Sequence, residues 1–357
     1  MLTLKNWVFL MKPLVHIGIA KSASTFLQLE VFPEMPGFYN FGKHHVDQEL
    51  KKSISSITRH TSVNWYARPG TKALEIFSQH TEKASDLGLR PILSDEDLSV
   101  YKFLDPELMA QRLFSIFGSY DVMLIIRSPF SWIKSQYLFR LSTGEKRAVQ
   151  GFDSWSKLHF SSNALGNDVS ELWFSTLVEC YKKHSQGNVY IMPYEILKQS
   201  RDKFAHFMSM VTSVDHSFFL EKLSVKPKKQ EHKLSINDCQ RRLFECLAFY
   251  DNGDPSRFAL EVLELADQEE LLVPSQFYSL LLEISKDSTF ERKYVFDCLY
   301  GISRSWADAQ APIQINLSNE LTDSLNALAK KQLRQLEKKF DFDLTGFGID
   351  KSIYLAP

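Results

Sequence analysis

Small and hydroxyl-bearing residues surround a lysine in the segment AKSAST, residues 20–25, which follows the short apolar run LVHIGI. Small side chains let a backbone approach an anion closely, and N–H groups at the start of a helix lack partners within that helix. The segment therefore predicts a phosphate-binding loop. It is not a Walker A sequence, because the lysine precedes the small residues and no glycine separates it from the helix. The residues expected to contribute are Lys21, Ser22, Ala23, Ser24 and Thr25.

A second cationic position follows another apolar run, in DVMLIIRSPFSWIKSQY, residues 121–137. Arg127 comes directly after that run, and a guanidinium can hold a phosphate through two parallel N–H groups. Ser135 comes eight residues later, on an expected helix from which its hydroxyl could reach the same group. A lone arginine after a strand is more often part of a surface ion pair. Its pairing with the lysine loop is what favours an anion site.

Acidic residues follow a third apolar run, in ILSDEDLS, residues 92–99. Asp95, Glu96 and Asp97 would stand at the carboxyl end of their strand, at the same edge of the sheet as the lysine loop. One of them could act as a general base, which must lie within hydrogen-bond reach of the proton that it removes. The alternative is that these acids only cap the next helix.

A parallel sheet would bring these three segments together. Short apolar runs predict buried strands at residues 14–19, 91–94, 122–126 and 188–192. Helical stretches lie between them, including those that begin at Pro106 and Leu172. Strands that alternate with helices predict an α/β fold with a doubly wound parallel sheet, in which ligands bind at the carboxyl ends of the strands.

The chain after Met192 changes character and consists mainly of predicted amphipathic helix. An apolar stripe from Leu317 to Phe340 predicts a helix that packs on the core, with Ser318 as a possible N-cap. We therefore expect an α/β core over residues 1–235 and a mainly helical C-terminal region over residues 236–357, packed on that core.

The two anion motifs together resemble those of the sulfotransferases that use 3′-phosphoadenosine 5′-phosphosulfate (PAPS). Members of this family carry a 5′-phosphosulfate loop after the first strand, and an arginine after a later strand with a serine eight residues on. Here HIGIAKSASTFLQ resembles the first motif and LIIRSPFSWIKSQY the second, while NVYIMPYEIL resembles a segment of the bacterial and carbohydrate-type branch. The resemblance covers residues 14–211. Ala20 and Ala23 stand where the family usually has proline and glycine.

This resemblance implies a P-loop-like fold and transfer of a sulfuryl group from PAPS, the donor substrate, to a hydroxyl or amine without a metal ion. Lys21 would stabilise the leaving phosphate, and residues 22–25 would hold the 5′-phosphate. Arg127 and Ser135 would bind the 3′-phosphate, and Glu96 would be the base, because carbohydrate-type members often use a glutamate from such a segment. A late loop often closes over the nucleotide in this family, which suggests a role for the basic run KPKKQEHKLS and its Lys229, Lys233 and Ser235.

The acceptor is expected to bind residues 41–70 and 141–168, whose polar and aromatic side chains would suit a saccharide. Two alternatives stay open. One is a P-loop kinase that acts on a small molecule and needs Mg²⁺. The other is a non-catalytic nucleotide-binding relative that has kept the fold and lost the chemistry.

The composition narrows the class of protein further. The 357 residues include 42 Lys+Arg and 43 Asp+Glu, which gives a net charge of -1. The protein as a whole therefore has no electrostatic field that would attract nucleic acid or an anionic membrane. No apolar run reaches the length of a membrane span, and His44, His45 and His60 are expected to be solvated loop residues rather than metal ligands.

The cysteines have neither disulfide-framework nor metal-site spacing, which predicts free thiols and a cytoplasmic location. The oligomeric state is left open. The cysteines are Cys180, Cys239, Cys246 and Cys298.

Overall fold

The computed structural model describes residues 12–42, 44–60, 63–99, 105–142, 152, 155–156, 172–224, 255–267, 275–286, 315 and 317–355. The chain divides into two compact units. The first, here called the sheet unit, comprises Met1–Trp132, Ser162–Gln230 and Ser318–Pro357, and the second comprises Ile133–Ser161 and Glu231–Leu317. This division groups the last forty residues with the sheet, unlike the predicted regions 1–235 and 236–357. The predicted boundary at residue 235 itself lies outside the described residues.

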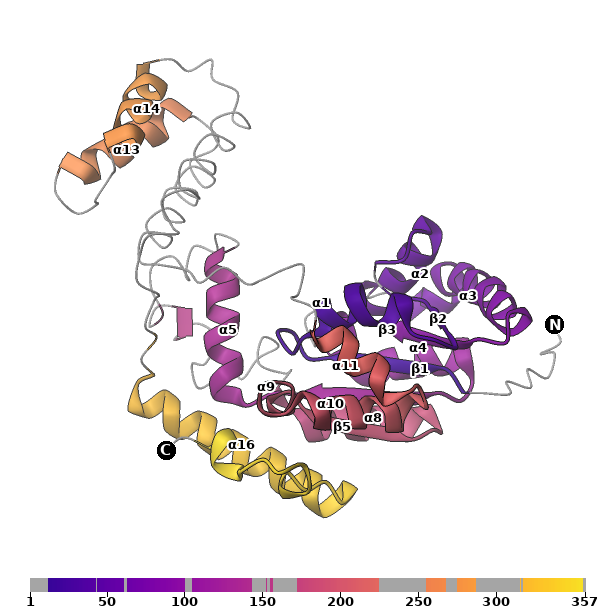
Figure 1. Ribbon diagram of the computed structural model, residues 1–357. Helices are drawn as coiled ribbons and strands as arrows, with labels where there is room; N and C mark the ends of the chain where they lie inside the picture. The colour runs from indigo at the N-terminus through magenta and orange to yellow at the C-terminus, as the bar shows by residue number, and fades with distance from the viewer. Residues whose placement is uncertain are drawn as a thin grey trace. The chain divides into compact units, whose positions relative to one another are not determined.

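Five parallel strands form the sheet in the order β2-β3-β1-β4-β5 (Figure 1). The predicted α/β fold with a parallel sheet flanked by helices is confirmed, and the four predicted strands are present. The edge strand β2 was missed, because its three half-buried residues form no apolar run. The strands are β1 (Leu14–Gly18), β2 (Phe38–Asn40), β3 (Arg90–Ser94), β4 (Asp121–Ile126) and β5 (Val189–Pro193).

The central strand β1 is buried along its whole length, between β3 and β4. Its register pairs His16 with Ser94 of β3 and Gly18 with Ile125 of β4. The carboxyl ends of these three strands therefore lie side by side, and the segments that follow them share one edge of the sheet.

Helices cover both faces of the sheet. The chain moves from β1 to the edge strand β2 through a helical segment at residues 24–34, and then returns through helices to β3, β4 and β5. Because parallel crossovers are right-handed, the reversal of direction places the first segment and the returning helices on opposite faces. The returning helices include α2 (Gln48–Arg59), α3 (Pro69–Asp86), α4 (Pro106–Phe117) and α8 (Phe174–Ser185).

The last strand is followed by α9 (Glu195–Gln199), α10 (Arg201–Thr212) and α11 (His216–Ser224). The predicted C-terminal helix is α16 (Asn319–Phe340), and its N-cap is confirmed, since the Ser318 hydroxyl accepts from Leu321 N at 3.3 Å. α16 packs on α8, where the backbone N–H of Ser175 donates to Gln332 Oε1 at 3.0 Å. Short 3₁₀ turns then lead to Tyr354, which is completely buried.

The second unit contains most of α5 (Pro129–Ser142), which begins in the sheet unit, together with α13 (Pro255–Asp267) and α14 (Ser275–Lys286). Tyr137 on α5 packs its ring edge against Phe152 at 5.2 Å and lies 5.6 Å from Trp155 between ring centroids. α13 and α14 contact each other, and Tyr278 donates to Asp267 Oδ1 at 2.8 Å.

Candidate anion-binding site

The topology of the sheet singles out the end of β1. From β1 the chain first moves towards β2, and from β3 it crosses β1 to reach β4 on the other side. A parallel sheet binds ligands where the strand order reverses in this way, because the two connections leave a crevice between them at the carboxyl ends of the strands. The segments at this switch point are the lysine loop after β1, the acidic segment after β3 and the arginine after β4.

The lysine loop has an unusual backbone conformation. A turn closes it where Ser22 N donates to Ile19 O at 3.1 Å, and both Lys21 and Ala23 have φ of 66°. This left-handed region is uncommon for residues with a β-carbon. Left-handed residues within a turn direct successive N–H groups to one side, which forms an anion-binding concavity. Ala23 therefore has the conformation for which glycine is preferred.

Gly18, at the end of β1, allows the helical segment to close over the strand. A β-carbon at this position would lie 1.9 Å from Ser24 Oγ and 3.1 Å from His16 Cε1. Ser24 is 2 % exposed, and its Oγ has no hydrogen-bond partner among the residues that the structure describes. A buried hydroxyl without a partner carries a desolvation cost that a ligand at the loop can relieve. The buried Ser24 hydroxyl is therefore the feature of the loop that is consistent with a bound phosphate.

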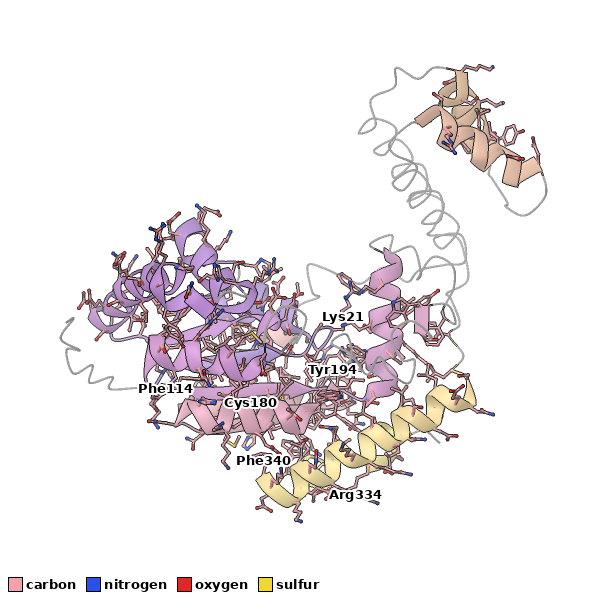
Figure 2. All side chains as sticks on the ribbon, turned by 180° about the vertical axis from the view of Figure 1, so that it is seen from behind. Lys21, Phe114, Cys180, Tyr194, Arg334 and Phe340 are labelled. Atoms are coloured by element: carbon pink, nitrogen blue, oxygen red, sulfur yellow. The ribbon has the colours of Figure 1, made fainter. Side chains whose placement is uncertain are left out.

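Arg127 links the two sequence motifs directly. Its guanidinium donates from Nη1 to the carbonyl oxygen of Lys21 and from Nε to Ser131 Oγ at 3.0 Å, and its Cζ lies 4.6 Å from the centre of the Tyr194 ring. Figure 2 labels Lys21 and Tyr194, which come from the loop after β1 and the turn after β5. The side chain is buried, so the sheet unit holds a cation against the lysine loop.

Ser135 was predicted to join Arg127 at the same phosphate. It lies on α5 beyond Trp132, where the second compact unit begins. Its role therefore stays a prediction. Within the sheet unit it is Ser131, one turn into the same helix, that contacts the guanidinium of Arg127.

Asp95 and Asp97 have structural roles after β3. Asp95 is buried and caps the short turn Glu96–Ser99, since its Oδ1 accepts from Asp97 N at 3.0 Å. Asp97 pairs with Arg59 of α2, whose Nε donates to Oδ2 at 2.9 Å, and this contact raises the pKa of the guanidinium. The helix-cap alternative thus holds for Asp95. Glu96 is half-buried in the same turn and stays the predicted base.

A hydrogen bond links the acidic turn to the end of β1, just before the lysine loop. Ser99 Oγ donates to the carbonyl oxygen of Gly18 at 3.1 Å. Beneath the loop, His16 Nδ1 lies 2.7 Å from Ser94 Oγ, which also accepts from Gln28 Nε2 at 3.1 Å. Burial lowers the pKa of His16 to about 3, so its imidazole is neutral near pH 7. A neutral polar network therefore joins β1, β3 and the helical segment that follows the loop.

Several other predicted residues fall elsewhere. Lys229, Lys233, Ser235 and most of residues 141–168 lie outside the described residues. The three histidines predicted to be solvated loop residues lie outside helices and strands: His44 is exposed, and His45 and His60 are half-buried. His45 Nδ1 accepts from Asp47 N at 3.0 Å. Across the described ranges no group of three metal-ligating side chains occurs. No helix within them is long and apolar enough to span a membrane.

Sequence reasoning missed part of the arginine's surroundings. The Glu195 carboxylate accepts from Ser128 N at 2.9 Å and from the Tyr354 hydroxyl at 2.7 Å. Glu195 follows β5 in the segment NVYIMPYEIL, which was recognised without a role for this residue. Tyr354 carries no local signal, because it reaches the site only through the path of the whole chain.

Comparisons with known proteins give limited information. No family model matches the chain, and no curated protein matches it. Among solved structures, the chain is similar to the crystal structure of a sulfotransferase from Alicyclobacillus acidocaldarius. The identity is 11 %, the match covers 96 % of this chain and 100 % of the other, and the TM-score is 0.47. We therefore take function from the site itself.

Proposed function

We propose that this chain transfers a sulfuryl group from PAPS to a hydroxyl or amine acceptor. The observation that carries the proposal is the contact between its two anion motifs: the Arg127 guanidinium donates to the Lys21 carbonyl at the switch point of the sheet. A nucleotide with phosphates on both its 5′ and 3′ positions needs two such cationic groups on neighbouring strand ends.

The loop and the arginine would bind different phosphates of the donor. Because the Ser22 N–H closes the turn of the loop, the N–H groups of residues 23–25, the Ser24 hydroxyl and a hydrogen bond from Thr25 Oγ would hold the 5′-phosphate. Arg127, with Ser135, would hold the 3′-phosphate. Each charge-assisted hydrogen bond of this kind stabilises binding by about 1.5–3 kcal/mol.

Lys21 and Glu96 would act on the reacting atoms. As the acceptor oxygen attacks sulfur, the bond between sulfur and the phosphate oxygen breaks and its electron pair passes to that phosphate. The Lys21 ammonium stabilises this charge more in the transition state than in the ground state. The proton of the acceptor passes to the Glu96 carboxylate. The products are the sulfated acceptor and 3′,5′-adenosine diphosphate.

A saccharide is the acceptor class that we favour, with residues 41–70 as part of its site. Asp47 belongs to this segment, and its Oδ2 lies 3.2 Å from Nε2 of His80 on α3. His80 Nδ1 in turn lies 3.1 Å from the hydroxyl of Tyr39, on the strand just before the segment. Polar side chains beside an accessible aromatic ring suit sugar recognition, and the Tyr39 ring is half-buried rather than part of the core.

Sulfuryl transfer from labelled PAPS to a panel of saccharide acceptors tests the function. We expect Lys21→Ala to lower turnover by about 10²–10³-fold while donor affinity changes only a few-fold, because the charge acts mainly in the transition state. Lys12→Ala is the matched control, since Lys12 donates to Gln186 O at the opposite, amino end of the strands. Turnover that survives Lys21→Ala would remove the lysine from the mechanism.

A further inference from the structure

A buried carboxylate, that of Glu195, accepts hydrogen bonds from residues that adjoin or contact Arg127. Glu195 is 7 % exposed and accepts hydrogen bonds at both of its oxygens. Oε1 accepts from Ser128 N at 2.9 Å and from Ser131 Oγ at 3.4 Å, and Oε2 accepts from the Tyr354 hydroxyl at 2.7 Å. Removing any of these donors leaves a buried charge with fewer partners, so the cluster favours a single arrangement.

These contacts reach Arg127 by two routes. Ser128 follows Arg127 in the chain, so the hydrogen bond of its N–H fixes the peptide group that joins the two residues. This also fixes the backbone from which the arginine side chain extends. The Ser131 hydroxyl accepts from Arg127 Nε at 3.0 Å and so fixes the plane of the guanidinium. A guanidinium binds a phosphate bidentately only when this plane is correctly oriented.

The C-terminal segment, residues 350–355, supplies the remaining part of the cluster. Tyr354 is completely buried, and Ser128 Oγ donates to the carbonyl oxygen of Ile353 at 2.8 Å. The segment is stiffened locally, because Asp350 Oδ1 accepts from Ser352 N at 2.8 Å and Lys351 pairs with Glu337 of α16 at 2.5 Å. Residues more than two hundred positions apart in the sequence therefore meet behind Arg127.

We infer that Glu195 and Tyr354 are positioning residues for Arg127, so that the C-terminal segment completes the 3′-phosphate site. This inference rests on the proposed function. It adds to it the part of the chain that orients the arginine for phosphate binding. Neither residue is expected to touch the nucleotide. Their effect passes through Ser128 and Ser131.

Tyr354→Phe tests this inference, because it keeps the ring and removes only the hydroxyl. We expect the variant to bind 3′,5′-adenosine diphosphate about tenfold more weakly, which corresponds to one hydrogen bond to a charged group, and to bind 5′-AMP as the wild type does. Hydrogen exchange should also become faster in the peptide that spans residues 127–132. Glu195→Gln should change the affinity ratio of the two nucleotides in the same direction.

Tyr120→Phe is the matched control. Tyr120 is also fully buried and donates to a backbone oxygen, that of Ala110, at 3.1 Å, but it lies just before β4, at the opposite end of the strand. We expect this variant to keep both the wild-type affinity ratio and the exchange rate of residues 127–132. A loss of selectivity in both variants would indicate general loosening of the fold and would overturn the inference.

Wild-type binding separates this inference from the proposed function. If the wild type prefers the 3′-phosphorylated nucleotide and Tyr354→Phe keeps that preference unchanged, the positioning role is wrong while the donor site stands. If the wild type shows no preference for the 3′-phosphate, the donor assignment fails and the positioning role fails with it.

Discussion

Ala23 shows how one residue can hold a glycine-like conformation. With φ of 66° and ψ of 12° it lies in the left-handed region, and so does Lys21, two residues before it. An L-residue in this region costs about 1–2 kcal/mol. The sequence identified Ala23 as a departure from the family pattern, but only the structure gives the sign of its φ angle.

Ala23→Gly should relieve this strain. We expect the free energy of unfolding to rise by about 1 kcal/mol, because glycine adopts positive φ without steric cost. Chemical denaturation measures the change. Ala20→Gly is the control: among the described residues Ala20 is not one of those with positive φ, so glycine there should lower stability by about 0.5–1 kcal/mol. Equal effects of the two substitutions would contradict the assigned strain.

His16 makes the stability of the protein depend on pH. Its pKa falls from 6.5 in the unfolded chain to about 3 in the folded one, because burial disfavours the imidazolium. The unfolded state therefore binds a proton that the folded state does not bind between pH 6.5 and 3. The contribution of His16 is complete above pH 6.5 and is lost as the pH falls, at about 1.4 kcal/mol per pH unit.

Denaturation of His16→Gln over the same pH range tests this origin. We expect the variant to lose less stability on acidification than the wild type does, whatever its stability at neutral pH. His206→Gln, at an exposed position, serves as the control. A His16→Gln protein with the full wild-type loss between pH 6.5 and 4 would show that other groups cause it.

At the scale of elements, a buried arginine holds the end of α2. Arg112 on α4 is 1 % exposed and donates to the carbonyl oxygens of Ile57 at 2.9 Å and His60 at 2.8 Å, while its guanidinium lies 4.8 Å from the Trp65 ring centre. Carbonyls in the last turn of a helix lack partners within it. Arg112 supplies those partners from a neighbouring helix.

Arg112→Met should lower the free energy of unfolding by about 3 kcal/mol, since methionine keeps the stem but leaves these carbonyls without donors. Thermal or chemical denaturation measures this loss. Arg334→Met, on the exposed side of α16, should change stability by no more than about 0.5 kcal/mol (Figure 2). A small effect of Arg112→Met would mean that water replaces the arginine at these carbonyls.

The elements themselves were largely predictable. Four strands and the helix at residues 319–340 follow from apolar runs, helical periodicity and the Ser318 cap. β2 was not predictable, because a three-residue edge strand of half-buried residues has neither a run nor a period. The contact of Arg127 with Ser131 was missed because sequence spacing could not distinguish Ser131 from Ser135 as its hydrogen-bond partner.

At the scale of the whole molecule, long-range contacts escaped sequence reasoning. The grouping of Ser318–Pro357 with the sheet depends on contacts such as that of Tyr354 with Glu195, 159 residues away. No local pattern encodes such a pairing, and each residue alone resembles an ordinary core or surface position. The positions of Lys21 and Arg127 after β1 and β4 were predictable, because each residue follows one apolar strand directly.

Calorimetric titration of the wild-type protein with nucleotides tests the central claim most directly. The two cationic groups at the switch point predict that 3′,5′-adenosine diphosphate binds at least about tenfold more tightly than 5′-AMP, because a guanidinium–phosphate contact is charge-assisted. The affinity should not depend on Mg²⁺. Preference for ATP with Mg²⁺ would contradict the account in favour of a kinase, and the absence of binding by any of these nucleotides would contradict it in favour of a relative that has lost its donor.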